Sequence, residues 1–244
     1  MLKKRRLKVV AVMPAYNAAK TLKKTYLDIP KGVVDKVLVV DDGSRDETVR
    51  VAKKLGLEVV VHPQNRGYGG NQKTCYTLAL SQGADIIVMI HPDYQYDSTL
   101  TDELINPILK GRFNVMLGSR ISTRKEVLAG GMPLYKYISN RFLTFAENLV
   151  LGQNLSEYHT GFRAYTKEVL GKLPFHKYSD DFVFDQQILI GAIAQGAKIG
   201  EISVPVRYFP EASSANFRRS LVYGLSILRE LLLYILFGKH HFLD

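Results

Sequence analysis

The first half of the chain alternates short, β-branched apolar runs with longer amphipathic stretches. This alternation is typical of βαβ units that build a mostly parallel sheet. Buried parallel strands need continuous apolar runs, and VLVV and IIVMI are such runs. The sequence therefore predicts an α/β fold. The predicted strands cover residues 8–13, 36–40, 58–62, 86–90 and 115–118, and the predicted helices cover 18–27, 46–55, 70–82 and 100–110.

The alternation of short apolar runs and amphipathic stretches ends after Gly118. A long apolar stretch predicts a helix over 134–151, and a polar loop follows around 158–163. A second helix is predicted over 181–195 and a strand over 198–206. At 244 residues the chain is long enough to bury one substantial core.

The last segment, 216–237, is rich in apolar residues, but arginines and a glutamate interrupt it. A helix that spans a membrane needs about 20 mainly apolar residues. The uninterrupted runs here are shorter, so we expect a helix that lies at a membrane surface or packs against protein. We therefore divide the chain into a domain over 1–212 and a C-terminal amphipathic segment over 213–244, which contacts a membrane surface or another subunit.

The formal net charge of +10 predicts attraction to polyanions, namely nucleic acid, anionic lipid or phosphorylated ligands. The basic block at 3–8 is either a solvated tail or a membrane-surface contact. Cys75 is the only cysteine, so the chain can form neither an intrachain disulfide nor a thiolate metal cluster. A reducing, cytosolic setting fits this composition, and we expect no export signal.

Polar residues close four successive apolar runs. They are MPAYNA (13–18), DDGSRDET (41–48), HPQNRGYGGN (62–71) and HPDYQYD (91–97). Any one of these segments reads as a turn or a helix cap. In α/β sheets, however, ligands bind beyond the carboxyl ends of the strands. Four such segments at one edge of the sheet therefore indicate a ligand site.

These segments carry groups suited to a nucleotide. Asp41 and Asp42 could accept hydrogen bonds from a base or a ribose, because ionised carboxylates are acceptors only. The glycines at 67, 69 and 70 could let the backbone approach a phosphate or a base at a helix start. Asp93 and Gln95 offer hard oxygen ligands for Mg²⁺ or Mn²⁺. His91 is either a third ligand or a hydrogen-bonded histidine at the strand end.

The order and spacing of the motifs resemble those of the family 2 glycosyltransferases of GT-A fold. The likeness is narrower with the polyprenyl-phosphate sugar transferases of the dolichyl-phosphate mannose synthase type. It extends from VMPAYNA through VVDDGSRDET, NRGYGGN, HPDYQYD, GSR (118–120) and HTGFRAY (159–165) to VPVRY (204–208). It implies a Rossmann-like, mostly parallel GT-A sheet flanked by helices, followed by C-terminal amphipathic helices.

The resemblance also implies functional residues. The family's aspartate motif usually begins with aspartate, and His91 stands at that position here, whereas Asp93 and Gln95 keep their places as metal ligands. The implied catalytic residues are Asp93, Arg120 and Asp185. The implied nucleotide-binding residues are Pro14, Ala15, Tyr16, Asn17, Asp41, Asp42 and Gly67, and the implied contacts of the acceptor phosphate are Ser119, Arg120, Lys136, Ser139, Arg163 and Arg207.

The activity implied is inverting transfer of a sugar from a UDP- or GDP-sugar to a polyprenyl or dolichyl phosphate. A lipid phosphate is already an anionic nucleophile and needs no strong general base. A hydroxyl acceptor in cell-envelope glycan synthesis is the alternative, and it would need a base such as Asp180, Asp181 or Asp185. We expect the protein in the cytoplasm, attached peripherally to the cytoplasmic face of the membrane. A homo-oligomer is compatible with this location.

A third hypothesis is a protein that binds nucleic acid or a nucleotide without transferring a sugar. The charge of +10 suggests it, but the sequence shows no nucleic-acid-binding module. We therefore expect no nucleic-acid partner.

Overall fold

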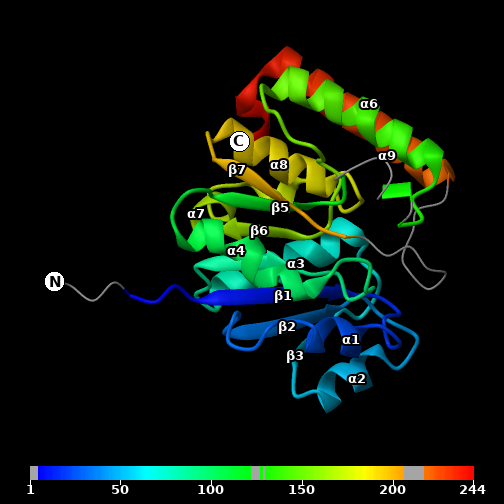
Figure 1. Cartoon of the computed structure of the whole chain (residues 1–244), viewed down its shortest axis with the longest axis vertical. Coiled ribbons are helices and arrows are strands. Elements are labelled where there is room, and N and C mark those ends of the chain that lie inside the picture. The colour runs from blue at the N-terminus through cyan, green and yellow to red at the C-terminus, as the bar shows by residue number, and fades with distance from the viewer. Residues whose placement is uncertain (1–4, 122–126, 129, 206–216) are drawn as a thin grey trace.

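The computed structural model describes residues 5–121, 127–128, 130–205 and 217–244. Its centre is a seven-stranded sheet with the order β3-β2-β1-β4-β6-β5-β7 (Figure 1). Neighbouring strands run parallel except for β6, which is antiparallel to both β4 and β5. The strands are β1 (Val9–Ala15), β2 (Lys36–Asp41), β3 (Glu58–Val61), β4 (Ile86–Met89), β5 (Val115–Ser119), β6 (Arg163–Thr166) and β7 (Ile199–Ser203).

The predicted α/β class and the mostly parallel sheet are confirmed. The five strands expected in the first half are all present close to their expected bounds, whereas β6 was missed. Its four residues, RAYT, begin at the last residue of the segment expected to be a polar loop. Both Ala164 and Tyr165 are fully buried, so this strand has apolar cover on two faces and shows no alternating pattern.

Helices flank the sheet on both sides (Figure 1). The long helix α6 has the bounds that the sequence predicts, whereas α8 begins three residues later than expected, at Phe184 instead of 181. The helices are α1 (Leu22–Leu27), α2 (Thr48–Lys54), α3 (Tyr68–Ser81), α4 (Thr101–Leu109), α6 (Leu134–Leu151), α7 (Lys167–Leu170), α8 (Phe184–Ala194) and α9 (Phe217–Phe237). Short 3₁₀ turns occupy Ser98–Leu100, Phe175–Lys177 and Lys239–Phe242.

The apolar core lies in two layers, one on each face of the sheet. On β1, Val10 and Val12 belong to the layer under α3 and α8, while Ala11 and Met13 belong to the layer under α1 and α4. Successive side chains of a strand point to opposite faces, so a strand covered on both sides is apolar throughout. This double burial explains the continuous apolar runs. Because β1, β2, β3 and β4 run parallel, their carboxyl ends lie at one edge of the sheet.

Helices α6 and α9 pack along one another at the top of the molecule in Figure 1. Helix α9 buries Ile227, Glu230 and Leu231, but most of its other large apolar side chains are exposed. The stretch Arg218–Phe237 is, by length and by its mean hydropathy of 1.7, sufficient to cross a membrane. One continuous helix joins the terminal apolar runs, so length and composition alone do not exclude a crossing, and the predicted placement at a membrane surface or against protein stays a prediction. The expected boundary at residue 212 lies outside the described residues.

Candidate functional site

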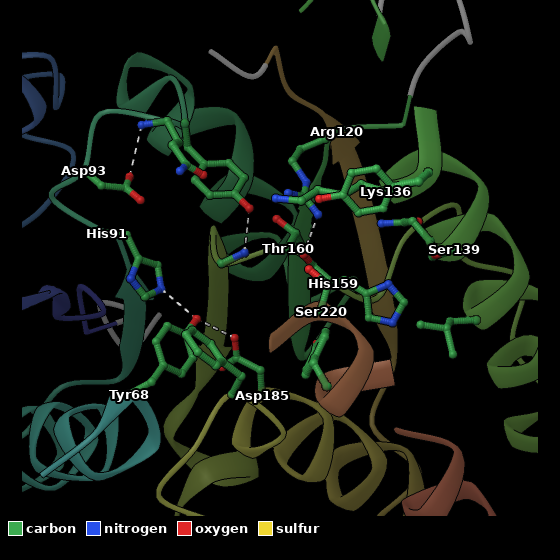
Figure 2. Close-up of a pocket in the computed structure, with 18 residues that line it drawn as sticks. Tyr68, His91, Asp93, Arg120, Lys136, Ser139, His159, Thr160, Asp185 and Ser220 are labelled. Carbon is green, nitrogen blue, oxygen red and sulfur yellow. Dashed lines mark hydrogen bonds between the residues drawn. The ribbon is translucent and has the colours of Figure 1, made fainter. Parts of the chain in front are cut away.

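Two adjoining cavities open at the carboxyl edge of the parallel strands. The smaller has a volume of about 240 Å³ and the larger about 820 Å³. They share a wall made of Tyr68, His91, Asp93, Phe182 and Tyr223. Figure 2 shows the smaller cavity, with His91 and Asp93 on one side and Arg120, Lys136 and Ser139 on the other. The polar segments that close β1, β2 and β4 therefore meet at one site, as the sequence predicts.

The larger cavity contains most of the residues expected to bind a nucleotide. Pro14, Ala15, Tyr16, Asp42 and Gly67 all line it. Its wall holds carboxylates from the first half of the chain and three arginines from α9. These arginines are Arg218, Arg219 and Arg229.

Asp42 organises the loop after β3. Its Oδ1 lies 2.7 Å from His62 Nδ1 and accepts a hydrogen bond from the backbone N–H of Arg66 at 2.8 Å. Its Oδ2 accepts one from the backbone N–H of Gly67 at 3.1 Å. The side chain is almost fully buried. Asp42 therefore shapes the cavity wall, and its hydrogen-bonding capacity is largely occupied by protein.

Asp41 and Asn17 do not line the cavity; Asp41 is buried, and Asn17 is exposed. Asp41 Oδ1 accepts a hydrogen bond from the backbone N–H of Ser44 at 3.0 Å, and its Oδ2 is buried without a partner among the described residues. Asn17 has a positive φ of 52°, and its Oδ1 accepts a hydrogen bond from the backbone N–H of Arg45 at 2.9 Å. Asn17 thus ties the loop after β1 to the loop after β2.

The glycines at the start of α3 approach protein backbone. The N–H of Gly69 donates to the carbonyl oxygen of Asp180 at 2.7 Å, so that carbonyl occupies the amino end of the helix. A Cβ on Gly67 would lie 2.7 Å from the same oxygen, and a Cβ on Gly69 would lie 2.5 Å from the carbonyl oxygen of Ser179. The close approach predicted for a phosphate or a base is therefore made by the loop before α8.

Asp93 is the carboxylate best placed to hold a metal. Its Oδ1 accepts a hydrogen bond from the backbone N–H of Gln95 at 3.1 Å, and its Oδ2 bonds to no described residue. Burial raises the pKa of this carboxyl group to about 6, which a cation would counteract. Burial also lowers the pKa of His91 to about 4, so its imidazole is neutral at pH 7.

The described residues do not gather three or more His, Cys, Asp or Glu side chains as a closed metal cage. Mg²⁺ sites at diphosphates commonly use one or two carboxylates and take their remaining ligands from water and phosphate oxygens. Asp93, with Gln95 and His91 beside it, fits the protein's share of such a site.

One side of the smaller cavity carries two cationic side chains, across from the carboxylate of Asp93 (Figure 2). Lys136 and Arg120 both line it, and burial together with the charge of Arg120 lowers the pKa of Lys136. Arg120 is in turn held by the fully buried Glu157, whose Oε1 accepts a hydrogen bond from Arg120 Nε at 2.9 Å. Burial alone would raise the pKa of Glu157, but the charge and hydrogen bonds of Arg120 lower it below its usual value. Two cations on the same side of the cavity favour an anionic ligand at that side.

Two residues expected at the acceptor phosphate line neither cavity, and a third lies outside the described residues. The Ser119 hydroxyl is buried against Ser156 Oγ at 2.7 Å. Arg163 is fully buried and donates to the carbonyl oxygens of Tyr158 at 2.8 Å and Asp185 at 2.9 Å. Arg207 is the residue that the structure leaves undescribed.

Asp185 lines the smaller cavity, but other side chains engage its carboxylate. Oδ2 accepts a hydrogen bond from the Tyr68 hydroxyl at 2.8 Å, and Oδ1 accepts one from Gln72 Nε2 at 2.9 Å. The guanidinium of Arg163 lies 3.7 Å from Oδ2. Burial and the Asp185 charge raise the pKa of Tyr68 well above its usual value, so its phenol keeps its proton. Asp185 thus belongs to a buried network.

The comparisons with known proteins agree with this architecture. The family model described as glycosyl transferase family 2 matches residues 10–173. The chain belongs to glycosyltransferase family 2. It is therefore a glycosyltransferase, and its sheet and flanking helices form the GT-A fold.

Among relatives, the chain is 30% identical over 229 residues to an uncharacterized protein of Methanocaldococcus jannaschii, covering 94% of this chain and 93% of that one. It is 29% identical over 242 residues to the UDP-N-acetylglucosamine–dolichyl-phosphate N-acetylglucosaminyltransferase of Methanococcus voltae, covering 92% of this chain and 95% of that enzyme.

The fold also matches solved structures. Glucosyl-3-phosphoglycerate synthase of Mycobacterium tuberculosis in complex with UDP superposes with a TM-score of 0.72 at 21% identity, covering 93% of this chain and 79% of that one. The same enzyme with Mn²⁺, UDP-glucose and phosphoglyceric acid gives a TM-score of 0.71 at 21% identity, with the same coverage. At this identity the likeness shows the fold.

Sequence reasoning missed several residues of this family 2 site. Tyr68 lines both cavities and lies inside the motif NRGYGGN, from which the sequence predicted only the glycines as site residues. An aromatic residue at the start of a helix was the signal that could have identified it. His159 lies in HTGFRAY and lines the smaller cavity. Tyr223 and the arginines of α9 reach the site only through the folding back of the last helix, which no local pattern reveals.

Proposed function

We propose that this glycosyltransferase moves a sugar, with inversion, from a UDP- or GDP-sugar to a polyprenyl or dolichyl phosphate. One observation carries the proposal: the smaller cavity combines Lys136 and Arg120 with an apolar surface beside it. Tyr135 and Leu134 of α6 are exposed next to Lys136, and Leu221 and Val222 of α9 are exposed next to the cavity residues Ser220 and Tyr223. A phosphate attached to a long apolar chain has both kinds of partner there.

The larger cavity fits the nucleotide diphosphate of the sugar donor. Its volume of about 820 Å³ and its position beside Asp93 suit the base, the ribose and the diphosphate. Arg218 and Arg219 line it and could neutralise the leaving diphosphate. Mg²⁺ or Mn²⁺, held by Asp93 and Gln95, would supply further charge stabilisation on that diphosphate.

The chemistry follows from the two cavities meeting at His91 and Asp93. A phosphate oxygen of the acceptor attacks the anomeric carbon, a new C–O bond forms, and the bond from that carbon to the diphosphate breaks. The acceptor oxygen is already ionised, so no side chain needs to remove a proton. Lys136 and Arg120 hold the nucleophile, and this alignment is the main contribution asked of the protein.

The exposed apolar faces of α6 and α9 support a location at a membrane surface. Large apolar side chains at helical spacing are more than half exposed along both helices, although α6 and α9 pack on each other. A contiguous apolar surface of this kind marks an interaction site. A second copy of the chain could cover the same faces, so an oligomer interface is the alternative to a membrane surface. The exposed residues are Ile138, Phe142, Phe145, Leu149, Leu221, Val222, Leu225, Leu232, Ile235, Leu236 and Phe237.

The Methanococcus voltae relative supports a lipid acceptor, because its name states transfer to dolichyl phosphate. It also makes UDP-N-acetylglucosamine the first sugar donor to test. The relation extends over nearly the full length of both chains.

A saccharide or another hydroxylated acceptor remains the second candidate. Asp181 favours it: this side chain lines the larger cavity, and its Oδ1 accepts a hydrogen bond only from the neighbouring backbone N–H of Phe182, at 2.7 Å, among the described contacts. A carboxylate at that wall could act as the base that a hydroxyl requires. Replacement of Asp181 by Asn should then abolish transfer to a hydroxyl and leave transfer to a phosphate unchanged.

The test is transfer from labelled UDP- and GDP-sugars to a short-chain polyprenyl phosphate in the presence of Mn²⁺ or Mg²⁺. The lipid-linked sugar is separated by thin-layer chromatography. We expect product with the wild type and with Lys110→Ala, which replaces an exposed lysine outside both cavities, and much less product with Lys136→Ala. Absence of lipid-linked product with every sugar donor, in a preparation that binds nucleotide, would overturn the lipid acceptor.

A further inference from the structure

His91 belongs to a hydrogen-bonded chain whose direction can be assigned. The Tyr68 hydroxyl lies 2.8 Å from Asp185 Oδ2 and 3.2 Å from His91 Nε2 (Figure 2). A phenol has one proton to donate, and a carboxylate can only accept. The Tyr68 proton therefore points to Asp185, and the Tyr68 oxygen accepts the N–H of His91 Nε2.

The Asp185 end of this hydrogen-bonded chain is held in place by two further side chains. Gln72 Nε2 donates to Asp185 Oδ1 at 2.9 Å, and the buried guanidinium of Arg163 lies 3.7 Å from Oδ2. Both neighbours stabilise a carboxylate that accepts hydrogen bonds at this position. Groups outside the cavities therefore fix the direction of the hydrogen bonds, in which His91 donates to Tyr68 and Tyr68 donates to Asp185.

The Nδ1 atom of His91 is left with an unshared electron pair. A Cβ on Gly161 would lie 2.7 Å from Cδ2 and 3.0 Å from Nε2 of His91, so the backbone at Gly161 covers that edge of the ring. Nδ1 lies on the opposite edge and bonds to no described residue (Figure 2). The Tyr68 ring stacks nearly parallel to the imidazole, 5.3 Å away at 5°, and His91 lines both cavities next to Asp93.

We propose that Nδ1 of His91 is a ligand of the divalent cation held by Asp93. This inference rests on the proposed site for the sugar donor. Histidines that bind metals almost always donate their other ring N–H to an oriented acceptor, and the bond to Tyr68 is that arrangement. The protein then gives the cation one nitrogen ligand and one carboxylate oxygen. A site with two carboxylates would carry one more negative charge. Imidazole suits later transition metals, whereas oxygen ligands suit Mg²⁺.

The decisive measurement is pulsed electron paramagnetic resonance of Mn²⁺ with the wild-type protein in excess over Mn²⁺ and UDP. We expect a nitrogen coupling that changes when the protein's histidines carry ¹⁵N, which separates it from the nitrogens of the base. The coupling should disappear in His91→Gln and in His91→Asp. In His91→Asp, Mg²⁺ should displace Mn²⁺ more readily than it does in the wild type.

A second variant tests the hydrogen-bonded chain. Tyr68→Phe keeps the ring and removes its hydroxyl, and loss of such an oriented partner weakens metal binding by about 10–100-fold. Tyr178→Phe is the matched control, because its hydroxyl bonds to the carbonyl oxygen of Phe242 away from both cavities. We expect wild-type Mn²⁺ affinity in that control.

Bound Mn²⁺ without a histidine coupling, or a failure of Mn²⁺ to bind with UDP, overturns the inference. Both results are distinct from a failure of the proposed function, which is read from the lipid-linked product. A histidine coupling in a protein that glycosylates no polyprenyl phosphate would support the role of His91 and overturn only the lipid acceptor.

Discussion

Replacement of Asp185 by Asn should destabilise the fold, so a loss of activity in this variant would not by itself indicate a catalytic role. Asn has the same shape but no charge, so the fully buried Arg163 loses its ionic partner 3.7 Å away. Breaking a buried pair in this way costs about 3–5 kcal/mol, a large part of the roughly 5–15 kcal/mol by which a domain is stable. For a chain of this length, 1 kcal/mol corresponds to about 2–4 °C in Tm. We therefore expect Tm to fall by roughly 6–20 °C.

Thermal unfolding followed by circular dichroism, with and without urea, measures this loss. Asp181→Asn is the matched control, because that side chain is exposed and its replacement should change the stability by less than about 0.5 kcal/mol. A Tm within about 2 °C of the wild type, combined with complete loss of sugar transfer at 25 °C, would refute the structural role. Asp185 would then act directly on the reactants, as the sequence alone suggested.

Three further predictions concern the cavity, the glycines and the amino-terminal edge of the sheet. Lys136→Ala should raise the KM for polyprenyl phosphate about tenfold or more with little change in the KM for the sugar donor, because a hydrogen bond to a charged group contributes about 1.5–3 kcal/mol. Gly69→Ala should destabilise the fold by about 1–3 kcal/mol in urea unfolding, since its Cβ would meet backbone at 2.5 Å, whereas Gly224→Ala in α9 should not, since its Cβ would meet only Leu143, at an ordinary contact distance of 3.6 Å. Burial would raise the pKa of Asp85, but its hydrogen bonds from Lys167 and from the backbone at Lys8, and its pair with Arg5, hold it well below its ordinary value. The stability that this carboxylate contributes is therefore fully present above about pH 4 and is lost progressively as the pH falls further, so wild type and Asp85→Asn should differ in Tm at pH 7, and the difference should narrow steadily below pH 4.

The parallel half of the fold could be predicted from the sequence mainly because three of its strands, β1, β2 and β4, are buried on both faces. Strands β1, β2 and β4 consist almost entirely of buried residues, and such runs are visible without any partner. Strand β6 could not be predicted, since its four residues have no periodicity of their own. Its place between β4 and β5 is decided by those neighbours, which pair with it on either side.

The candidate site could be predicted only as far as strand ends determine it. Asp42, Asp93 and Arg120 follow buried strands, and the topology alone brings them to one edge. The partners of each side chain could not be predicted, because they come from distant segments. Arg163, for example, reads as a phosphate ligand in HTGFRAY, but its side chain points into the protein and binds carbonyl groups.

The position of α9 bears on whether this helix crosses a membrane. Its length and hydropathy allow a crossing, since about 20 helical residues extend over about 30 Å. Yet Ser220 and Tyr223 line the smaller cavity, and Arg229, further along the same helix, lines the larger one. A helix inserted through a bilayer would withdraw these side chains from both cavities and would place the buried Glu230 in hydrocarbon, where a charged side chain costs at least about 2.5 kcal/mol. The packed position keeps the walls of both cavities complete, which argues against a crossing, and it leaves the apolar face outward, as the proposed attachment at a membrane surface requires.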